Sequence, residues 1–300
     1  MNKKFKEDLN FKRIIISGAN GFTGRYVCRE LKSRGIIFSV ILRPGSCTKW
    51  MIKNNIEFYF ADLNNIEQLT NILKGNECLI NIASIGFGSA SKIVKSCKNA
   101  NIKRVIFISS TSIFTQLNSK SKKIRIEAEK SIFHSNLNWT IFRPTMIFGS
   151  PKDRNMIKLI NWINKVPFIP IFGKGKNFQQ PVYVKDLAWS IVEIIGNENT
   201  FQKTFELSGP KPLTFIEIIK TISFYLGKKP LMIFLPYLFF SRILKLIESF
   251  GIKFFIKSEQ IMRLNEDKIF CHNKAKTIFG YKPTEFNKAI FEEIEIYKKK

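Results

Sequence analysis

The chain has 300 residues, and 45% of them are hydrophobic. That is enough for a substantial core, in one large domain or in one domain with an appended lobe. Five scattered cysteines without a CxxC pair, and only two histidines, exclude a disulfide framework and argue against a zinc centre, so no metal is expected and the thiols indicate a cytoplasmic protein. The first residues, MNKKFKEDLNFKR, contain no apolar stretch of the kind that a signal peptide needs.

The net charge of +26 has three interpretations. The lysines are spread along the chain together with many Asn, Ile and Phe residues, which favours a compositional bias on a solvated surface. Attraction to an anionic membrane surface is the second interpretation, and nucleic-acid binding, for which no module is recognisable, is the third. We therefore expect no nucleic-acid partner, and a cytoplasmic protein for which peripheral contact with a membrane surface is an open alternative. The oligomeric state does not follow from the sequence.

Apolar runs of strand length alternate with helical patterns through the first half of the chain. These patterns predict strands at 12–17, 36–42, 56–61, 77–83, 103–109 and 138–143, and helices at 21–35, 64–75, near 88–100 and at 122–135. Continuous Ile, Val and Phe runs indicate strands that are covered on both faces. The alternation predicts an α/β fold, a Rossmann-type doubly wound parallel sheet with right-handed crossovers.

The rhythm changes after about residue 150. A loop rich in Pro and Gly, PFIPIFGKGKNFQQP, is followed by mainly helical patterns with short strands. We expect a dinucleotide-binding domain over residues 11–172 and a smaller, mainly helical lobe over 173–300. The stretch 184–208 is expected to return to the sheet, because it again has a helix followed by a strand.

The most apolar segment, PLMIFLPYLFF at 230–240, is too short to span a bilayer and is interrupted by Pro236. It has two interpretations. It forms a helix that lines the core of the second lobe, or it continues through SRILKLIESFGIKFFIK as a basic amphipathic segment that lies on a membrane.

The strongest motif is SGANGFTG, in which Gly18, Gly21 and Gly24 follow a predicted strand and open a predicted helix. Gly18 permits a tight turn, Gly21 lets the backbone approach a pyrophosphate, and Gly24 allows the helix to pack closely on the strand. The amides at the helix N-terminus then point at the phosphates. This context predicts a bound dinucleotide, and a glycine-rich turn without a ligand is the alternative.

The end of the second predicted strand bears on the choice between NAD and NADP. An acidic residue there would hold the ribose 2′-hydroxyl, but VILRPGS offers Arg43 and Ser46 instead. A guanidinium suits a 2′-phosphate, so the sequence favours NADP over NAD. The alternative is that Arg43 only caps an exposed loop.

In their order along the chain, the motifs resemble those of the short-chain dehydrogenase/reductase superfamily in its extended or atypical form, the NAD-dependent epimerase/dehydratase family. The resemblance rests on SGANGFTG, ADL, NIAS, VIFISSTSIF, FRPTMIFG, PVYVKDLA and GYKPTEF, which cover nearly the whole length. Together with the glycine and arginine arguments, it implies that these residues bind the cofactor: Gly18, Asn20, Gly21, Phe22, Thr23, Gly24, Arg43, Asp62, Leu63, Ala83, Ser109 and Pro144. It also implies a nucleotide-sugar substrate, which the loop GKGKNFQQPVYV could contact through Lys174, Gln179 and Gln180.

The chain departs from this family at the acid–base pair. The family uses Tyr-x-x-x-Lys, where the lysine and the cofactor lower the tyrosine pKa, and a serine that hydrogen-bonds the reacting oxygen. Ser110 has the serine position. When KKIRIEAEKSI is aligned on the family's Lys-x-x-Ala-Glu helix through Glu129, Arg125 has the lysine position and Ser121 the tyrosine position. A serine hydroxyl does not ionise near neutral pH, and an arginine cannot shuttle protons.

No tyrosine lies between Tyr59 and Tyr183, so no shift of the alignment restores the pair. If the chain is catalytic, we expect Ser110 and Arg125 to contribute, with the proton supplied through water or by a residue of the second lobe such as Tyr183.

Three functions remain compatible with these observations. The first, which the sequence favours, is an NAD(P)-dependent epimerase, reductase or dehydratase acting on a nucleotide sugar. The second is a non-catalytic NAD(P)H-binding protein with a structural, assembly or redox-sensing role, since the resemblance extends to a respiratory complex I subunit and to NmrA-like regulators that lack the catalytic pair. The third is a binder of nucleic acid or membrane surfaces that acts through charge alone.

Overall fold

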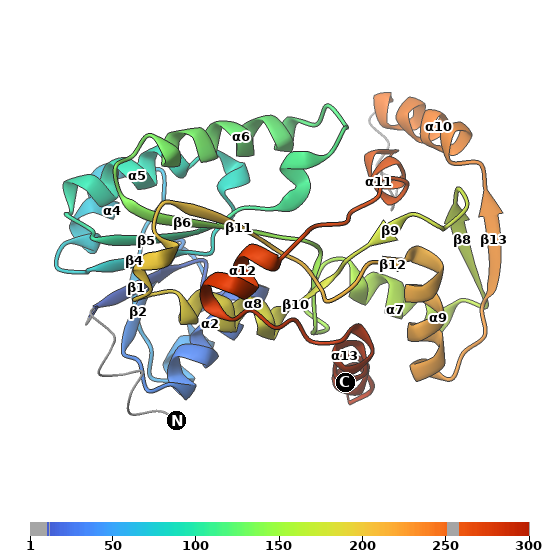
Figure 1. The fold of residues 1–300 in the computed structure, drawn as a ribbon, viewed down its shortest axis with the longest axis horizontal. Helices are drawn as coiled ribbons and strands as arrows, with labels where there is room; N and C mark the ends of the chain where they lie inside the picture. The colour runs from blue at the N-terminus through green and yellow to red at the C-terminus, as the bar shows by residue number, and fades with distance from the viewer. Residues whose placement is uncertain (1–10, 12, 251–257, 300) are drawn as a thin grey trace.

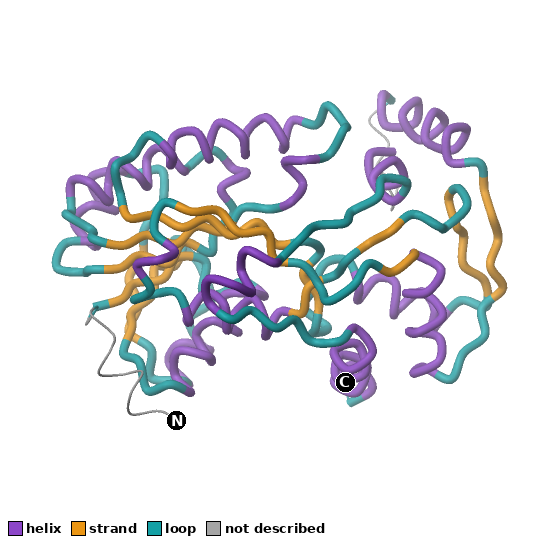
Figure 2. Tube along the Cα trace, viewed as in Figure 1, coloured by secondary structure: helices purple, strands orange, loops and turns teal. Residues whose placement is uncertain are grey.

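The computed structural model describes residues 11, 13–250 and 258–299. Its larger part is a seven-stranded sheet with the order β11-β6-β5-β4-β1-β2-β3, in which every neighbouring pair is parallel (Figure 1, Figure 2). The predicted doubly wound α/β sheet is therefore confirmed. Its strands are β1 (Ile14–Ser17), β2 (Phe38–Leu42), β3 (Glu57–Phe60), β4 (Cys78–Asn81), β5 (Arg104–Ile108), β6 (Asn138–Pro144) and β11 (Lys203–Leu207).

Helices cover both faces of this sheet (Figure 1). One face carries α2 (Phe22–Ser33), α8 (Val184–Glu193) and α12 (Asn273–Phe279), and the other carries α4 (Ile66–Leu73), α5 (Ala90–Asn99) and α6 (Lys120–Phe133). Because successive strand side chains point to opposite faces, Ile14 and Ile16 of β1 join the core on the first side and Ile15 joins the core on the second. This explains why the strands read as continuous apolar runs. The short helix α3 (Lys49–Lys53) lies between β2 and β3.

The strand order reverses beside β1, which has β2 on one side and β4 on the other. In open parallel sheets, ligands bind in the crevice that this reversal creates beyond the carboxyl ends of the strands. The loop after β1 holds the glycine motif, and the loops after β4 and β5 hold Ala83 and Ser110. The topology thus brings the predicted cofactor and catalytic residues to one edge of the sheet.

A buried arginine stabilises the opposite end of β5. The Arg104 side chain is fully buried and donates hydrogen bonds to the Asn138 and Ile194 carbonyls and to the hydroxyls of Thr140 and Thr200. Burial lowers its pKa to about 10, so the guanidinium remains charged at neutral pH. It ties β5 to β6 and to the end of α8.

The second lobe has its own core and two small sheets (Figure 1). Its elements are α7 (Met156–Lys165), β8 (Phe168–Phe172), β9 (Phe178–Gln179), β12 (Leu213–Thr214), α9 (Phe215–Leu226), β13 (Leu231–Leu235), α10 (Tyr237–Ser249), α11 (Ser258–Leu264) and α13 (Phe286–Lys298), and the short strands β7 (Ile147–Phe148) and β10 (Val182–Tyr183) pair beside it. None of the helices in the described part of the chain combines the length and the hydropathy needed to traverse a bilayer.

Two features of this lobe differ from the boundaries drawn from the sequence. Helix α7 and strand β8 lie in it although they precede residue 173, because β8 pairs with β13 and not with the main sheet. The segment 230–240 is not one helix: β13 ends at Leu235, and α10 begins after Pro236. Conversely, 184–208 returns to the main sheet as expected, since β11 is its edge strand and α8 packs against it, and α12 packs there as well. The proposed continuation through residue 257 falls partly outside the described residues.

Candidate active site

The turn after β1 shows why three glycines are needed. Gly18 has φ +79°, and a Cβ there would lie 2.5 Å from the Ala83 amide nitrogen. At Gly24 a Cβ would lie 2.2 Å from the Gly18 carbonyl oxygen, so the chain's own backbone excludes any side chain. Gly21 is different, because it has an ordinary φ of −69° and the nearest atom to its Cβ would be the Gly18 oxygen at 3.2 Å. Gly18 and Gly24 serve packing, whereas Gly21 leaves open space at the N-terminus of α2.

A single cleft extends from this turn to the second lobe, with a volume of about 1510 Å³. That exceeds the roughly 300–1,000 Å³ of a site for one small molecule, so the cleft has room for a dinucleotide and a second ligand. All of the residues predicted to bind cofactor line it: Gly18, Asn20, Gly21, Phe22, Thr23, Gly24, Arg43, Asp62, Leu63, Ala83, Ser109 and Pro144.

Three buried polar atoms in the lining have no hydrogen-bond partner among the described residues. They are Asn20 Oδ1, Ser109 Oγ and Ser112 Oγ. Buried polar atoms in proteins are nearly always hydrogen-bonded, so these atoms fit a polar ligand that reaches them. Together with the open amide corner at Gly21, they match the needs of a dinucleotide, and Asp62 and Arg43 stand exposed at the adenosine side of the same cleft.

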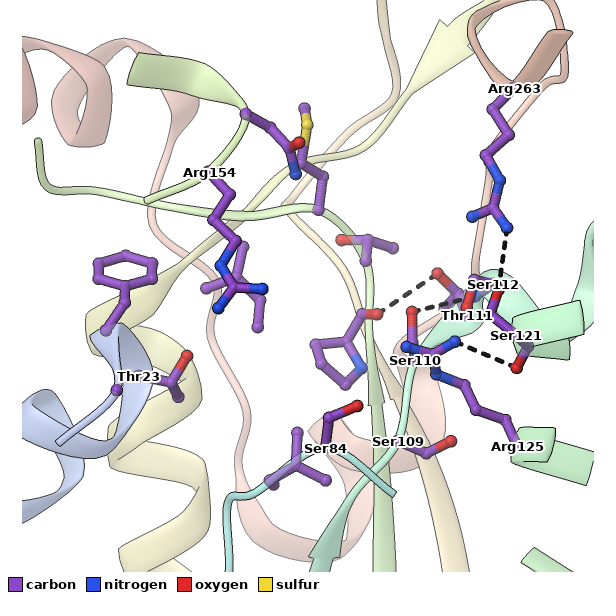
Figure 3. Close-up of a pocket in the computed structure, with 18 of the residues that line it drawn as sticks. Thr23, Ser84, Ser109, Ser110, Thr111, Ser112, Ser121, Arg125, Arg154 and Arg263 are labelled. Atoms are coloured by element: carbon purple, nitrogen blue, oxygen red, sulfur yellow. Dashed lines mark hydrogen bonds between the residues drawn. The ribbon is translucent and has the colours of Figure 1, made fainter. Parts of the chain in front are cut away.

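Ser110 lies at the C-terminal edge of the sheet in the lining of the cleft (Figure 3). Its backbone is extended, and its Oγ accepts a hydrogen bond from the Ser112 amide at 3.1 Å. This contact uses a lone pair of the oxygen and leaves the hydroxyl hydrogen for a ligand. The geometry therefore suits a hydrogen-bond donor to a reacting oxygen.

Ser121, at the position where a catalytic tyrosine was sought, is flanked by Arg125 and Arg263 (Figure 3). Arg125 Nη1 donates to the Ser121 carbonyl at 3.2 Å, and Arg263 of α11 reaches across to the hydroxyls of Ser119 and Ser121, at 3.2 and 3.5 Å. Burial lowers the pKa of Arg125, and the nearby charge of Arg263 lowers it further. Arg263 also pairs with Glu259. Arg263 could not be assigned to this site from local sequence patterns, because it lies in a different lobe.

Helix α6 is fixed to the sheet by an ion triad one turn beyond Arg125. The Arg143 guanidinium of β6 binds Glu129 of α6 through its Nε, at 3.1 Å from Oε2, and Glu206 of β11 through Nη1, at 2.9 Å. The carboxylates raise the pKa of Arg143 against the opposing effect of burial. Ser121 and Arg125 therefore project from a helix that is held in place.

Tyr183 is not placed to act as the acid in the cleft in place of the missing tyrosine. Its hydroxyl is buried outside the cleft lining and donates to Glu292 at 2.7 Å, and burial together with this carboxylate raises its pKa above the usual value. Lys268 fits the role better. It lines the cleft, its Nζ donates to the Arg263 carbonyl at 2.6 Å, and burial lowers its pKa to about 8. Nothing in the local sequence singled it out, because only the fold brings it to the cleft.

The residues expected to contact substrate divide into two groups. Gln179 lines the cleft, where its amide donates to the Glu266 carbonyl. Lys174 is exposed and does not line the cleft. Gln180 is buried between the Gly209 carbonyl and the Phe270 amide, where it joins segments of the chain. Arg154, on the loop after β7, lies across the cleft on the side of Thr23 (Figure 3).

A buried carboxyl pair supports the loop that carries Arg154. Asp153 caps α7 by accepting from the Asn155 and Ile157 amides, and Glu293 of α13 accepts from the Gly149 amide. Asp153 Oδ2 and Glu293 Oε1 are buried and have no hydrogen-bond donor among the described residues, and a proton shared between the two carboxyl groups would satisfy both. Burial, and then Asp153, raise the pKa of Glu293 far above its usual range.

A family profile described as NAD(P)H-binding matches residues 18–161. Subunit 9 of the NADH dehydrogenase 1 alpha subcomplex from Mus musculus is 25% identical over 69% of this chain, and the bovine sterol-4-alpha-carboxylate 3-dehydrogenase is 23% identical over 70%. This chain spans 59% and 69% of those two proteins.

Among solved structures, UDP-glucose 4-epimerase from Thermotoga maritima has a TM-score of 0.75 and 15% identity, covering 96% of this chain and 99% of the epimerase. That likeness concerns the fold, and the match of the profile concerns the cofactor-binding half. Residues 18–161 thus match an NAD(P)H-binding profile, and the chain as a whole has the fold of an epimerase.

Proposed function

We propose that the chain is an NAD(P)-dependent oxidoreductase whose substrate carries an anionic group, with a nucleotide sugar as the favoured class. The observation that carries this proposal is the continuity of one cleft from the glycine turn, past Ser110, to cations of the second lobe. A cofactor laid on the turn would reach Ser110 with its nicotinamide end, and the remaining space lies among Arg125, Arg154 and Arg263.

The arginines at the second-lobe end of the cleft indicate which chemical groups the second ligand carries. Burial, and then the nearby charge of Arg263, lowers the pKa of Arg125, and Glu259 pairs with Arg263. An anion placed between the two arginines would relieve their repulsion, and guanidinium groups bind phosphates and carboxylates through paired hydrogen bonds. The diphosphate of a nucleotide sugar has this chemistry, and the fold is shared with an epimerase solved with UDP-glucose.

Lys268 is our candidate for the proton transfer that the missing phenol would perform. Among the ionisable side chains that line the cleft in the described ranges, it is the one whose pKa is shifted to about 8, close to neutrality. An acid with a pKa near the working pH transfers protons efficiently. In a reduction, the protonated amine would donate to the developing alkoxide while Ser110 hydrogen-bonds the same oxygen.

NADP remains the favoured cofactor. Arg43 and Ser46 line the adenosine end of the cleft, and no acidic side chain follows β2 there. We expect Arg43→Ala to weaken NADPH binding about tenfold, corresponding to one lost charge-assisted contact, and to leave NADH binding unchanged. Equal effects on both nucleotides would indicate that Arg43 only caps its loop.

The test of the oxidoreductase starts with the nucleotide that co-purifies. Absorbance of the reduced cofactor is then followed against a panel of UDP- and dTDP-sugars, and the sugar products are analysed separately, because an epimerase shows no net change in absorbance. Ser110→Ala and Arg125→Gln should lower turnover and leave cofactor affinity nearly unchanged. Turnover equal to that of the wild type in both variants would contradict the roles given to these residues.

A second candidate function is a non-catalytic NAD(P)H-binding subunit or sensor. It is favoured by Ser121 at the tyrosine position and by the similarity to a subunit of mitochondrial NADH dehydrogenase. Cofactor binding with no turnover and no altered sugar across the panel would favour this candidate over the enzyme.

A further inference from the structure

Strand β13 and helix α10 form the end of the second lobe that lies away from the main sheet (Figure 1), and their exposed side chains include many large apolar ones. This surface, which we call the outer edge, consists of one face of α10 and the exposed side chains of β13. Its large apolar members are Leu231, Ile233, Phe234, Leu238, Phe239, Ile243, Leu246 and Phe250, and several are more exposed than buried: Leu231 at 68%, Phe239 at 60%, Leu246 at 61% and Phe250 at 73%. Eight exposed large apolar side chains on two consecutive elements exceed the single scattered ones that are normal on a soluble protein, and such a concentration indicates an interaction surface.

Helix α10 has two apolar faces, and within the described part of the chain one of them packs against the rest of the protein. Ser241 and Leu244 are buried, with Phe240 partly buried against Phe172 of β8. The opposite face carries Leu238, Phe239, Ile243, Leu246 and Phe250 in exposed positions. A helix that only lined a core would have polar residues there.

The charges on the outer edge are basic. Arg242 and Lys245 are exposed on the same side of α10 as the apolar residues, and Lys228 and Lys229 are exposed just before β13. The acid of α10, Glu248, accepts hydrogen bonds from Ser258 and is partly buried. Exposed apolar residues interleaved with cations, without an exposed acid on the helix, are typical of helices that lie in a membrane interface.

A second copy of the chain fits this surface poorly. A two-fold dimer through the outer edge would place the same patch of each copy against the other, so the Arg242 and Lys245 side chains of both copies would lie in one interface. The net charge of +26 adds to that repulsion. An anionic bilayer removes both difficulties, because it takes up the apolar side chains and attracts the cations.

We infer that the outer edge docks on the surface of an anionic lipid membrane, with α10 lying in the interface and Arg242 and Lys245 at the level of the lipid phosphates. Helix α11 packs on α10 and contributes Glu259, Gln260 and Arg263 to the cleft. Docking would therefore bring this side of the cleft within about one helix diameter, roughly 10 Å, of the lipid headgroups. The inference is independent of the proposed reaction, since it rests on exposure and charge outside the cleft.

Vesicle co-sedimentation of the full chain tests this inference, using phosphatidylcholine vesicles with and without about one third phosphatidylglycerol. The wild type should bind the anionic vesicles and bind the neutral ones far more weakly. The double variant Phe239→Ser, Leu246→Ser should bind anionic vesicles about tenfold more weakly or worse, because two side chains no longer enter the interface. The double variant Arg242→Gln, Lys245→Gln should lose about fivefold per cation on anionic vesicles only.

Two matched controls separate docking from general effects. Ile37→Ser with Ile52→Ser removes two exposed apolar side chains from the main domain, and Lys92→Gln with Lys95→Gln removes two exposed cations from α5. Both controls should bind like the wild type. The inference is overturned if the wild type ignores anionic vesicles, or if Lys92→Gln with Lys95→Gln weakens binding as much as the α10 charge variant. A third outcome also overturns it: light scattering shows that the wild type is a dimer, and the double variant Phe239→Ser, Leu246→Ser is monomeric but binds vesicles as well as the wild type does.

Discussion

Replacing Gly21 and Gly24 separately by alanine should distinguish the part of the turn that holds the fold from the part that holds the cofactor. The Gly21 backbone is ordinary, and its added Cβ would meet only the Gly18 oxygen at 3.2 Å. Gly21→Ala should therefore change the free energy of unfolding by less than about 1 kcal/mol. The Cβ would stand where a pyrophosphate approaches the amides of α2. Losing one charge-assisted hydrogen bond of about 1.5–3 kcal/mol weakens binding about ten- to a hundredfold.

Gly24→Ala should show the reverse pattern. Its Cβ would lie 2.2 Å from the Gly18 oxygen and 2.7 Å from the Ala19 Cα, so α2 has to move away from β1. Helix propensity favours alanine by about 1 kcal/mol, but overpacking against fixed backbone costs about 3 kcal/mol or more, and the net effect is destabilising.

Chemical denaturation gives the stability of both variants, and titration of NADPH or NADH fluorescence gives the affinity. The reasoning fails if Gly21→Ala binds both nucleotides within twofold of the wild type, because the phosphates then do not rest on this corner. It fails equally if Gly24→Ala is as stable as the wild type.

Three further predictions concern buried or shifted charges. If Lys268 is the proton donor for reduction, turnover should fall as the pH rises through about 8, because the amine then loses its proton. Lys268→Met should lower turnover and abolish this pH dependence. A wild-type turnover that is constant from about pH 6 to about pH 9 would contradict the assignment. The folded state raises the Glu293 pKa above the usual 4.5, so it holds a proton that the unfolded chain releases, and stability should fall from about pH 5 upward. Denaturation of Glu293→Gln should lack that slope, and an unchanged slope would argue against the shared proton. Arg104→Met removes the donor of four hydrogen bonds and should cost about 3–5 kcal/mol in unfolding free energy, whereas a loss below about 1 kcal/mol would show that water replaces the guanidinium.

Local patterns were sufficient to predict the first half of the chain. The apolar runs predicted the first six strands, of which all but the exposed edge strand β3 are largely buried on both faces. The motif SGANGFTG predicted the turn because close backbone contacts, within the motif and with Ala83, require its glycines. The cofactor residues follow from the same logic, since the carboxyl ends of parallel strands must meet at one edge. Their binding role is still a prediction, although all of them line the cleft.

The second lobe could not be predicted in the same way. The pairing of β8 with β13 joins residues more than sixty positions apart in the sequence, and no local signal records it. Arg263 and Lys268 reach the cleft only through this lobe. Gln180 illustrates the opposite problem, because a polar side chain in a loop beside the cleft can be fully occupied by the backbone of its own chain.

The chain crosses between the two lobes several times, and this limits which parts of the protein can be exchanged with those of a relative. After the first six strands it enters the second lobe, returns for α8 and β11, leaves again through α9 to α11, returns for α12, and finishes in α13. Tyr281 and Phe279 pack with Phe205 in the core beneath the sheet, although they follow most of the second lobe in the sequence. A chimera that grafted a relative's substrate half onto this cofactor half would need a junction at every crossing. Transplanting specificity is therefore more practical one side chain at a time within the cleft.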